Sequence, residues 1–254
     1  MSKINDAFKN GKALITFLTC GDPDIEITEQ LIMSIEEAGT DIIQLGIPFS
    51  DPTAEGPVIQ AASERALAGG TTTDKVFDMI ARIRDKVTVP LVILTYANVV
   101  FSYGIERFCE KAAQLGIDGL VLHDIPYEEM DEFTPACKAN GLTLISFAAP
   151  TSGERLPIIA KAAEGYIYCI SCKGTIGVEK IEALEMLKTI HECTDTPAVV
   201  GSRINTPELA ADLAQYADGI IIDEPIMELV GKYGRDSVPY VKGFVKVMKA
   251  AISK

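Results

Sequence analysis

The stretch Gln44-Leu-Gly-Ile-Pro-Phe-Ser-Asp-Pro-Thr-Ala-Glu55-Gly-Pro-Val-Ile-Gln60 decides the fold of this chain. It opens as the end of an apolar run and then breaks into a loop that is punctuated by proline and glycine and carries two acids, Asp51 and Glu55. In a parallel α/β protein, such a loop follows the carboxyl end of a buried strand. An α/β barrel places its chemistry at these strand ends, so the stretch predicts both a fold and the position of a site.

Apolar runs recur along the whole chain, with helical patterns between them. We predict eight strands, over residues 13–18, 42–45, 91–95, 119–122, 143–148, 165–170, 198–200 and 219–222. Helices are predicted over residues 25–38, 73–85, 105–115, 127–140, 156–163, 181–193, 207–215 and 238–253, with an extra N-terminal helix over residues 2–10 across the bottom of the barrel. Eight such units in about 250 residues favour a closed (β/α)8 TIM barrel over an open sheet. No linker divides the chain, so residues 1–254 are predicted to form a single domain.

Composition and charge narrow the classes of function. Hydrophobic residues make up 48% of the 254 residues, which is enough for a sizeable core. The net charge of −13 makes nucleic-acid binding improbable, because an acidic chain repels phosphate backbones. With neither a signal peptide nor an apolar run of membrane-spanning length in the sequence, we expect a cytoplasmic protein without a membrane partner.

The cysteines favour neither a disulfide framework nor a metal site. Six are scattered through the chain, at Cys20, Cys109, Cys137, Cys169, Cys172 and Cys193. Cys169 and Cys172 form a CxxC pair, but no second pair completes a zinc site. We therefore predict buried apolar thiols rather than a metal or redox centre.

Several predicted strand ends resemble the tryptophan synthase alpha chain family. The shared segments are Thr19-Cys-Gly-Asp-Pro-Asp24, Leu45-Gly-Ile-Pro-Phe-Ser-Asp-Pro52, Gly56-Pro-Val-Ile-Gln60, Thr95-Tyr-Ala-Asn98 with Tyr103-Gly104, Asp124-Ile-Pro126, Ala149-Pro-Thr151 and Thr206-Pro-Glu208. They follow the family's order over nearly the whole chain, and the second is highly specific to the family. The resemblance implies a (β/α)8 lyase of tryptophan biosynthesis that splits indole-3-glycerol phosphate into indole and glyceraldehyde 3-phosphate. It also implies no cofactor in this chain and a PLP-dependent beta chain as partner in an αββα complex.

The resemblance places proton transfer at two positions. Glu55 falls on the family's second carboxylate, usually an Asp, and Gln44 falls on its main acid/base Glu. The reaction must protonate C3 of the indole, polarise N1–H and deprotonate the glycerol hydroxyl, which two acids on opposite sides of the substrate can do. An amide cannot exchange a proton near pH 7. Unless another group takes over, we expect the rate to fall by roughly two to four decades.

The resemblance also implies an indole pocket and a coupling residue. Phe17, Leu94, Tyr96 and Tyr168 match positions that line the pocket, although each can equally belong to the barrel core. Asp51 matches a loop acid that couples the subunit to its partner, and the alternative is a turn-forming Asp before a proline.

The phosphate end departs furthest from the family. After the seventh strand, the family's Gly-Phe-Gly-Ile is replaced by Gly201-Ser202-Arg203-Ile204. After the eighth, Gly-Ser at a helix start is replaced by Asp223 and Glu224. Glycine lets backbone N–H groups approach a phosphate, whereas carboxylates repel it. Arg203 can therefore bind a phosphate or pair internally with the two acids, and we favour the internal pair.

Two further strand ends carry altered groups. His123 stands where the family has a small or apolar residue. The mobile loop that usually reads Gly-Val-Thr-Gly is here residues 174–177, so the family's threonine falls on Ile176, with Thr175 beside it as a possible substitute and Lys173 just before. We predict that His123, Lys173 and the altered residues Gln44, Arg203, Asp223 and Glu224 converge on one barrel mouth. A divalent metal held by His123, Asp223 and Glu224 is a less favoured hypothesis.

Three functions remain open from the sequence. The first is a working or residually active lyase that uses Glu55 with another proton donor. The second is a non-catalytic regulatory or binding subunit that still docks on a beta chain. The third is a barrel enzyme with a different, non-phosphate substrate. Resemblance of fold does not choose among them.

Overall fold

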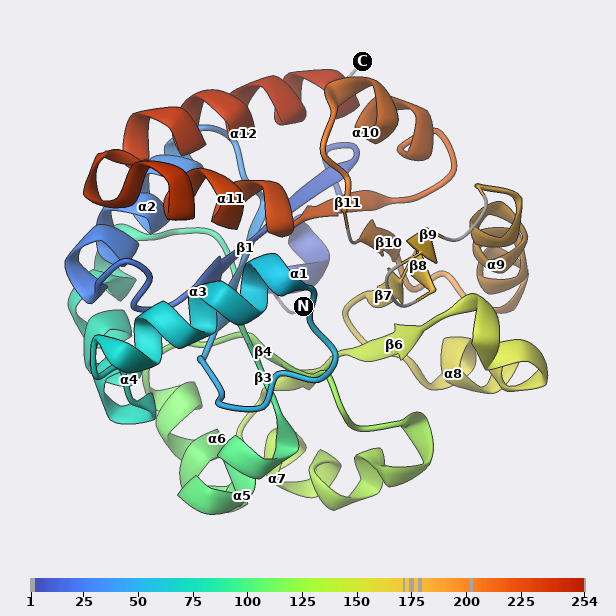
Figure 1. Ribbon diagram of the computed structural model, residues 1–254. Coiled ribbons are helices and arrows are strands. Elements are labelled where there is room, and N and C mark those ends of the chain that lie inside the picture. Colours follow the sequence, from blue (N-terminus) through green and yellow to red (C-terminus); the bar gives the residue numbers. More distant parts are fainter. Residues whose placement is uncertain (1–2, 171, 174–175, 178–179, 202, 254) are drawn as a thin grey trace.

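The predicted (β/α)8 barrel is confirmed in a computed structural model that describes residues 3–170, 172–173, 176–177, 180–201 and 203–253 (Figure 1). Its strands are β1 (Ala13–Thr19), β2 (Ile42–Gly46), β3 (Leu91–Thr95), β4 (Gly119–Leu122), β5 (Thr143–Leu144), β6 (Ser146–Ala148), β7 (Ile167–Ile170), β10 (Ala198–Gly201) and β11 (Gly219–Ile222). They pair in parallel in the order β5-β4-β3-β2-β1-β11-β10-β7-β6. The fifth predicted strand is split at Ile145 into β5, which pairs with β4, and β6, which pairs with β7. The two halves close the ring.

Helices surround the strands on the outside (Figure 1). Several begin at a side chain that accepts a backbone N–H of the first turn, as Asp24, Thr72 and Thr206 do for α2, α4 and α10. The helices are α1 (Lys3–Asp6), α2 (Ile25–Glu37), α3 (Pro57–Ala68), α4 (Thr73–Ile83), α5 (Ala97–Tyr103), α6 (Ile105–Gln114), α7 (Thr134–Ala139), α8 (Leu156–Ala162), α9 (Lys180–Cys193), α10 (Pro207–Leu213), α11 (Glu224–Tyr233) and α12 (Val238–Ile252), with 3-10 turns η1 (Arg84–Lys86), η2 (Tyr127–Glu132), η3 (Pro150–Arg155) and η4 (Gly234–Asp236). An antiparallel pair, β8 (Cys172–Lys173) and β9 (Ile176–Gly177), follows β7. Among the described residues, no helix is long and apolar enough to cross a membrane.

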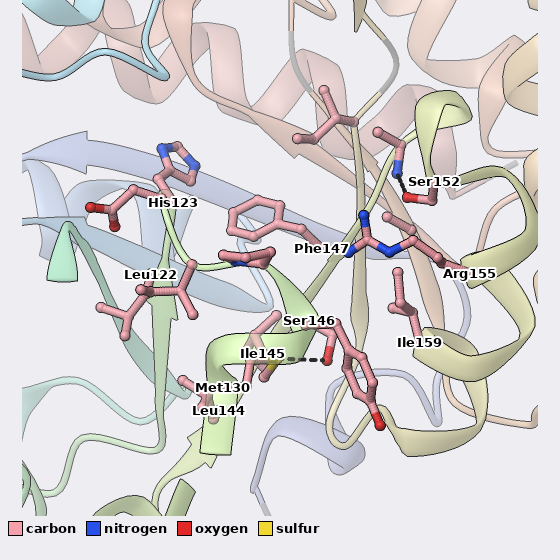
Figure 2. A pocket seen from close by; sticks show the side chains of 17 residues that line it. Leu122, His123, Met130, Leu144, Ile145, Ser146, Phe147, Ser152, Arg155 and Ile159 are labelled. Carbon is pink, nitrogen blue, oxygen red and sulfur yellow. Dashed lines mark hydrogen bonds between the residues drawn. The ribbon is translucent and has the colours of Figure 1, made fainter. Parts of the chain in front are cut away.

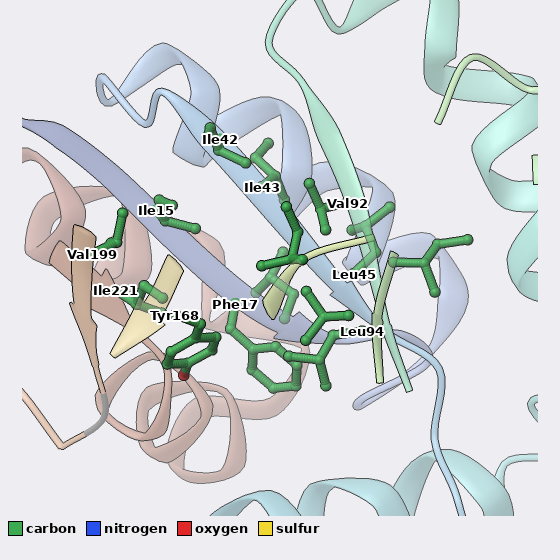
Figure 3. Close-up of a cluster of buried hydrophobic side chains, with 14 of the residues drawn as sticks. Ile15, Phe17, Ile42, Ile43, Leu45, Val92, Leu94, Tyr168, Val199 and Ile221 are labelled. Atoms are coloured by element: carbon green, nitrogen blue, oxygen red, sulfur yellow. The ribbon is translucent and has the colours of Figure 1, made fainter. Parts of the chain in front are cut away.

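Buried hydrophobic side chains from neighbouring strands pack together (Figure 3), and those at alternate strand positions point into the barrel interior. Ile15, Val92 and Ile221 are fully buried there. Nearer the carboxyl ends, the ring of Phe17 lies over Gly46, where an added Cβ would come within 2.6 Å of the ring. The described part of the barrel interior is therefore a packed core.

The N-terminal helix is shorter than predicted. It spans Lys3–Asp6 instead of residues 2–10, because residues 7–9 donate to the carbonyls three residues back and tighten into turns. Its Ile4 is fully buried and lies against Gly119, the first residue of β4. The segment thus covers the amino ends of the strands, as expected from the sequence.

Other helical predictions need correction. The helix predicted over residues 127–140 is divided into η2 and α7, because Pro135 falls in the first turn of α7 and cannot continue a helix from the preceding residues. Helices α3, α5 and α11 were not predicted at all. Pro57 and Pro225 mark the first turns of two of them, a signal that the strand-end loops obscured.

Candidate active site

Side chains from several strand ends meet at the mouth of the barrel. Glu55 lies in the loop between β2 and α3, His123 follows β4, and Asp223 follows β11. The side chains of His123 and Glu55 are only 11% and 9% exposed, and Asp223 is 5% exposed as a residue. These are titratable groups held largely away from water, which is typical of a functional site.

His123 and Glu55 form a close pair. The distance from Nδ1 of His123 to Oε1 of Glu55 is 2.8 Å. Burial alone lowers the pKa of His123, but the carboxylates of Glu55, Asp223 and Asp124 outweigh it and raise the pKa above its usual range. The geometry therefore favours an imidazolium paired with a carboxylate.

Aromatic rings surround this histidine. The ring centroids of Tyr96, Phe147 and Tyr168 lie 6.1, 4.9 and 6.2 Å from that of His123. Tyr96 also accepts the backbone N–H of Ala54 at 3.1 Å, which ties the acidic loop to the end of β3. Phe147 was missed from the sequence, and its place in an alternating strand, between Ser146 and a small residue, was the only signal for it.

A cavity of about 300 Å³ adjoins this group (Figure 2). His123 and Phe147 contribute to its lining from neighbouring strands, and Ser152 and Arg155 contribute from η3. Most of the remaining lining is apolar and includes Leu122, Met130, Leu144, Ile145 and Ile159. A small ligand with an apolar ring and a few polar atoms matches such a lining.

Gln44 lies inside the barrel. It is fully buried on β2, and its Nε2 donates at 2.8 Å to the hydroxyl of Tyr166, just before the start of β7. Its Oε1 has no hydrogen-bond partner among the described residues. The side chain is therefore engaged by Tyr166 inside the barrel, and its convergence with the rim groups stays a prediction.

Asp223 caps the start of α11. Its Oδ1 accepts the N–H groups of Glu224 at 2.7 Å and Arg203 at 3.3 Å. Burial, together with the negative charges of Glu55 and Glu224, raises the pKa of Asp223 to about 7. Pro225 has no N–H, and the N–H groups of Ile226 and Met227 donate to the carbonyl of Asp223. Within residues 223–227, every first-turn donor of α11 is thus used internally.

Arg203 pairs with Glu224, the arrangement favoured from the sequence. Arg203 Nε lies 3.5 Å from Glu224 Oε2, and the Arg203 backbone is left-handed, with a φ of 59°. The Glu224 carboxylate also approaches the acidic loop closely, since a Cβ added to Gly56 would lie 2.0 Å from Glu224 Oε1. A side chain at position 56 would displace this carboxylate.

The family model for "Tryptophan synthase alpha chain" matches residues 4–252 of this chain. The chain belongs to the tryptophan synthase alpha chain family. The alpha chain of Lacticaseibacillus casei is 43% identical over 99% of this chain and 96% of its own length. That of Thermoanaerobacter pseudethanolicus is 43% identical over 95% and 94%.

Solved structures agree with the sequence comparison. Tryptophan synthase from M. tuberculosis, in an aminoacrylate-bound form, superposes with a TM-score of 0.89 and 29% identity, covering 99% of this chain and 100% of that chain. The alpha chain from Legionella pneumophila superposes with a TM-score of 0.90 and 32% identity, covering 99% and 97%. The whole barrel therefore follows the family.

The remaining predicted residues fall into three groups. Phe17, Leu94 and Gly201 are buried at or near the strand ends, and a Cβ on Gly201 would lie 3.0 Å from the Tyr168 ring. Asp51 is exposed and accepts a hydrogen bond from Ser50. Thr175 and Ser202 lie outside the described residues, and of Lys173 only the backbone, in β8, is described.

The metal hypothesis gains no support from the described side chains. In them, no three His, Cys, Asp or Glu side chains lie close enough to hold an ion, so His123, Asp223 and Glu224 are not gathered as a ligand set. Cys169 is a buried thiol, whereas the side chain of Cys172 lies outside the described part.

Proposed function

We propose that this chain is the carbon–carbon lyase subunit of a tryptophan synthase, cleaving indole-3-glycerol phosphate to indole and glyceraldehyde 3-phosphate. The observation that carries the proposal is the position of Glu55, a nearly buried carboxylate at the mouth of an alpha-chain barrel. The mostly apolar cavity that His123, the partner of Glu55, helps to line suits an indole ring. Glu55 is then placed to accept the indole N1–H and to stabilise the positive charge that grows on the ring when C3 is protonated.

Gln44 cannot supply the proton that this reaction needs. Its amide has no titratable proton near pH 7, and its Nε2 is committed to Tyr166. The lyase proposal therefore requires a proton donor elsewhere at the mouth.

The remaining family properties are part of the same proposal. The chain works without a cofactor of its own, in the cytoplasm, with a beta chain as its partner. The exposed Asp51 is available for contact with that partner.

Indole release from indole-3-glycerol phosphate tests the proposal directly. We expect release by the purified chain and faster release when a beta chain is added, measured against the beta chain alone. If neither mixture releases indole, the lyase proposal is wrong. If the chain then still stimulates the serine chemistry of the beta chain, it is a regulatory subunit.

A second function is favoured by the Arg203–Glu224 pair and by the capped start of α11. Two carboxylates stand at this side of the mouth, and the first-turn donors of α11 are used internally. A dianion would have to displace these contacts, and repulsion from both acids would oppose it. The alternative is a barrel enzyme for a non-phosphorylated substrate.

Thermal-shift measurements separate the two functions. A lyase acting on a phosphate ester should be stabilised by glycerol phosphate and by inorganic phosphate, since a ligand of the folded state raises the melting temperature. Stabilisation by indole and by uncharged indole alcohols, with no response to either phosphate, favours the second function.

A further inference from the structure

At the described mouth of the barrel, Glu55, His123 and Asp223 are carboxyl and imidazole groups that are no more than 11% exposed. Cleavage needs one group that first gives a proton to C3 of the indole and then takes one from the hydroxyl. The hydroxyl oxygen is carried by the carbon bonded to C3, so one well-placed atom can serve both positions. A group that starts protonated and has a pKa near neutrality suits this cycle.

His123 is the best placed of the three. Its Nδ1 lies 2.8 Å from Oε1 of Glu55 in an ion pair that is not aligned as a hydrogen bond, which leaves Nε2 as the ring nitrogen that a substrate can meet. Phe147 and Tyr168 pack beside the imidazole, with centroids 4.9 and 6.2 Å away, and limit its rotation. His123 also lines the apolar cavity, and Figure 2 shows it beside Phe147. The pair thus combines an imidazole packed among aromatic rings, a carboxylate within 2.8 Å of it and an adjoining space for a ligand.

We propose that His123 is the acid–base catalyst of this site, with Glu55 as the carboxylate that orients it. The assignment rests on the proposed lyase function. His123, at the end of β4, then performs the proton transfer that Gln44, on β2, cannot perform. Oε1 of Glu55 holds the imidazole, and its second oxygen is left for the indole N1–H.

One atom, Nε2 of His123, gives the proton in the first step of the reaction and takes a proton back in the second. In the first step, the Nε2–H bond of the imidazolium breaks, the C3–H bond forms and the indole nitrogen takes the positive charge. In the second step, Nε2 takes the hydroxyl proton and the carbonyl forms as the bond between C3 and the hydroxyl-bearing carbon breaks. Its electron pair returns to the ring and neutralises the nitrogen. Indole and the aldehyde leave, and His123 is again an imidazolium.

The surroundings of His123 favour its charged form. Glu55 faces it from the loop after β2, Asp223 from the end of β11, and Asp124 is its neighbour in the chain. Tyr96 and Tyr168 face it as aromatic rings. Burial lowers the pKa of His123, and the three carboxylates together raise it above its usual range.

Asp223 is the competing donor, because its pKa is raised to about 7. However, its Oδ1 is held by the N–H groups of Glu224 and Arg203. These bonds favour the charged carboxylate and fix it as a helix cap. Removing the acid function at position 223 therefore distinguishes the two candidates.

The first experiment reads the ionisation of His123 without any turnover. The chain contains only two histidines, so NMR resolves both imidazoles, and His123→Gln and His191→Gln assign them. We expect His123 to titrate above its usual pKa and Glu55→Gln to move its midpoint down by at least one pH unit. If His123 is neutral at pH 7, or if its titration midpoint does not change in Glu55→Gln, the proposed charged pair of His123 and Glu55 is wrong.

The second experiment reads the pH dependence of indole release in single-turnover mode. We expect the wild-type rate to fall as pH rises through the pKa of His123, because the reacting form is the imidazolium. His123→Gln should lower the rate by at least about 100-fold and abolish this fall of the rate at high pH, which we call the basic limb. His191→Gln is the matched control: its ring pairs with Asp218 on the surface, and both the rate and the limb should be unchanged.

The outcomes keep the two proposals apart. Melting temperatures of all variants, within a few degrees of wild type, show that they fold. If the wild-type protein releases no indole, the lyase function is wrong. The catalytic role of His123 is then wrong as well, whatever the NMR titration shows. Wild-type release with a His123→Gln rate within threefold overturns His123 alone. If Asp223→Asn instead abolishes the basic limb while His123→Gln keeps it, Asp223 is the donor.

Discussion

The two sides of the barrel mouth use their carboxylates in opposite ways. On one side, Glu55 meets a histidine that borders a cavity. On the other, Asp223 caps its own helix and Glu224 pairs with Arg203. All three acids lie at strand ends, where a barrel places its chemistry. The position of an acid at a strand end therefore marks a candidate, whereas its partners decide whether it is available to a substrate.

The largest expected effect is a difference in the rate of indole release between variants on the two sides of the mouth. Glu55→Gln keeps the shape of the side chain but removes its charge, so it should lower indole release by about 100-fold or more. Glu224→Gln should lower it by no more than about threefold, because Glu224 is engaged by Arg203. Initial rates at saturating substrate measure both. Equal losses in the two variants would mean that both sides act on the substrate and would break the comparison.

The next effect is the pH dependence of stability contributed by Asp223. Its pKa is about 7 in the folded protein and near its usual 3.8 when unfolded, so between these values the folded state binds the extra proton. The free energy of unfolding should therefore fall as pH rises from about 4 to about 7, by up to ~1.4 kcal/mol per pH unit, and stay level above.

Asp223→Asn isolates this contribution, because an amide oxygen still accepts the Glu224 N–H but does not titrate. Urea unfolding of wild type and variant at several pH values gives the difference, in which other titrating groups cancel. If the difference in free energy of unfolding between wild type and variant does not depend on pH, Asp223 is ionised throughout the pH range. Burial then disfavours its charged form less than its surroundings indicate.

The fold was largely predictable because it depends on local patterns. The predicted bounds of β3, β4 and β11 are those of the structure. The candidate site was predictable only as a set of strand ends. Whether Gln44 faces the mouth depends on Tyr166, 122 residues away in the chain, and no local pattern contains that contact. The capping role of Asp223 was readable, since an Asp before a first-turn proline is typical of a helix start.

A smaller effect tests the interior contact between Gln44 and Tyr166. Tyr166→Phe leaves the buried Nε2 of Gln44 without its acceptor and should lower the free energy of unfolding by ~1–3 kcal/mol. Tyr240→Phe, at a tyrosine that is 48% exposed, is the control and should change little. The double variant Tyr166→Phe with Gln44→Leu should recover most of the loss, because neither partner then needs a hydrogen bond. Denaturant midpoints at an unchanged slope measure all three. A neutral Tyr166→Phe would mean that Gln44 turns elsewhere and is free to face the mouth.

The smallest effect concerns Arg203, where two contributions oppose each other. Removing the side chain loses an ion pair with Glu224, worth about 0–1 kcal/mol for a partly exposed pair. Glycine at this position relieves a left-handed backbone, which costs other residues roughly 1–2 kcal/mol. Arg203→Gly should therefore change the free energy of unfolding by less than about 1 kcal/mol, whereas Arg203→Ala, which keeps the strained backbone but loses the pair, should be the less stable of the two. If the alanine variant is as stable as the glycine variant, the backbone at this strand end is not strained. The charged contacts of Arg203 would then determine its position. The ion pair with Glu224 would hold this side of the mouth more strongly than a partly exposed pair is expected to.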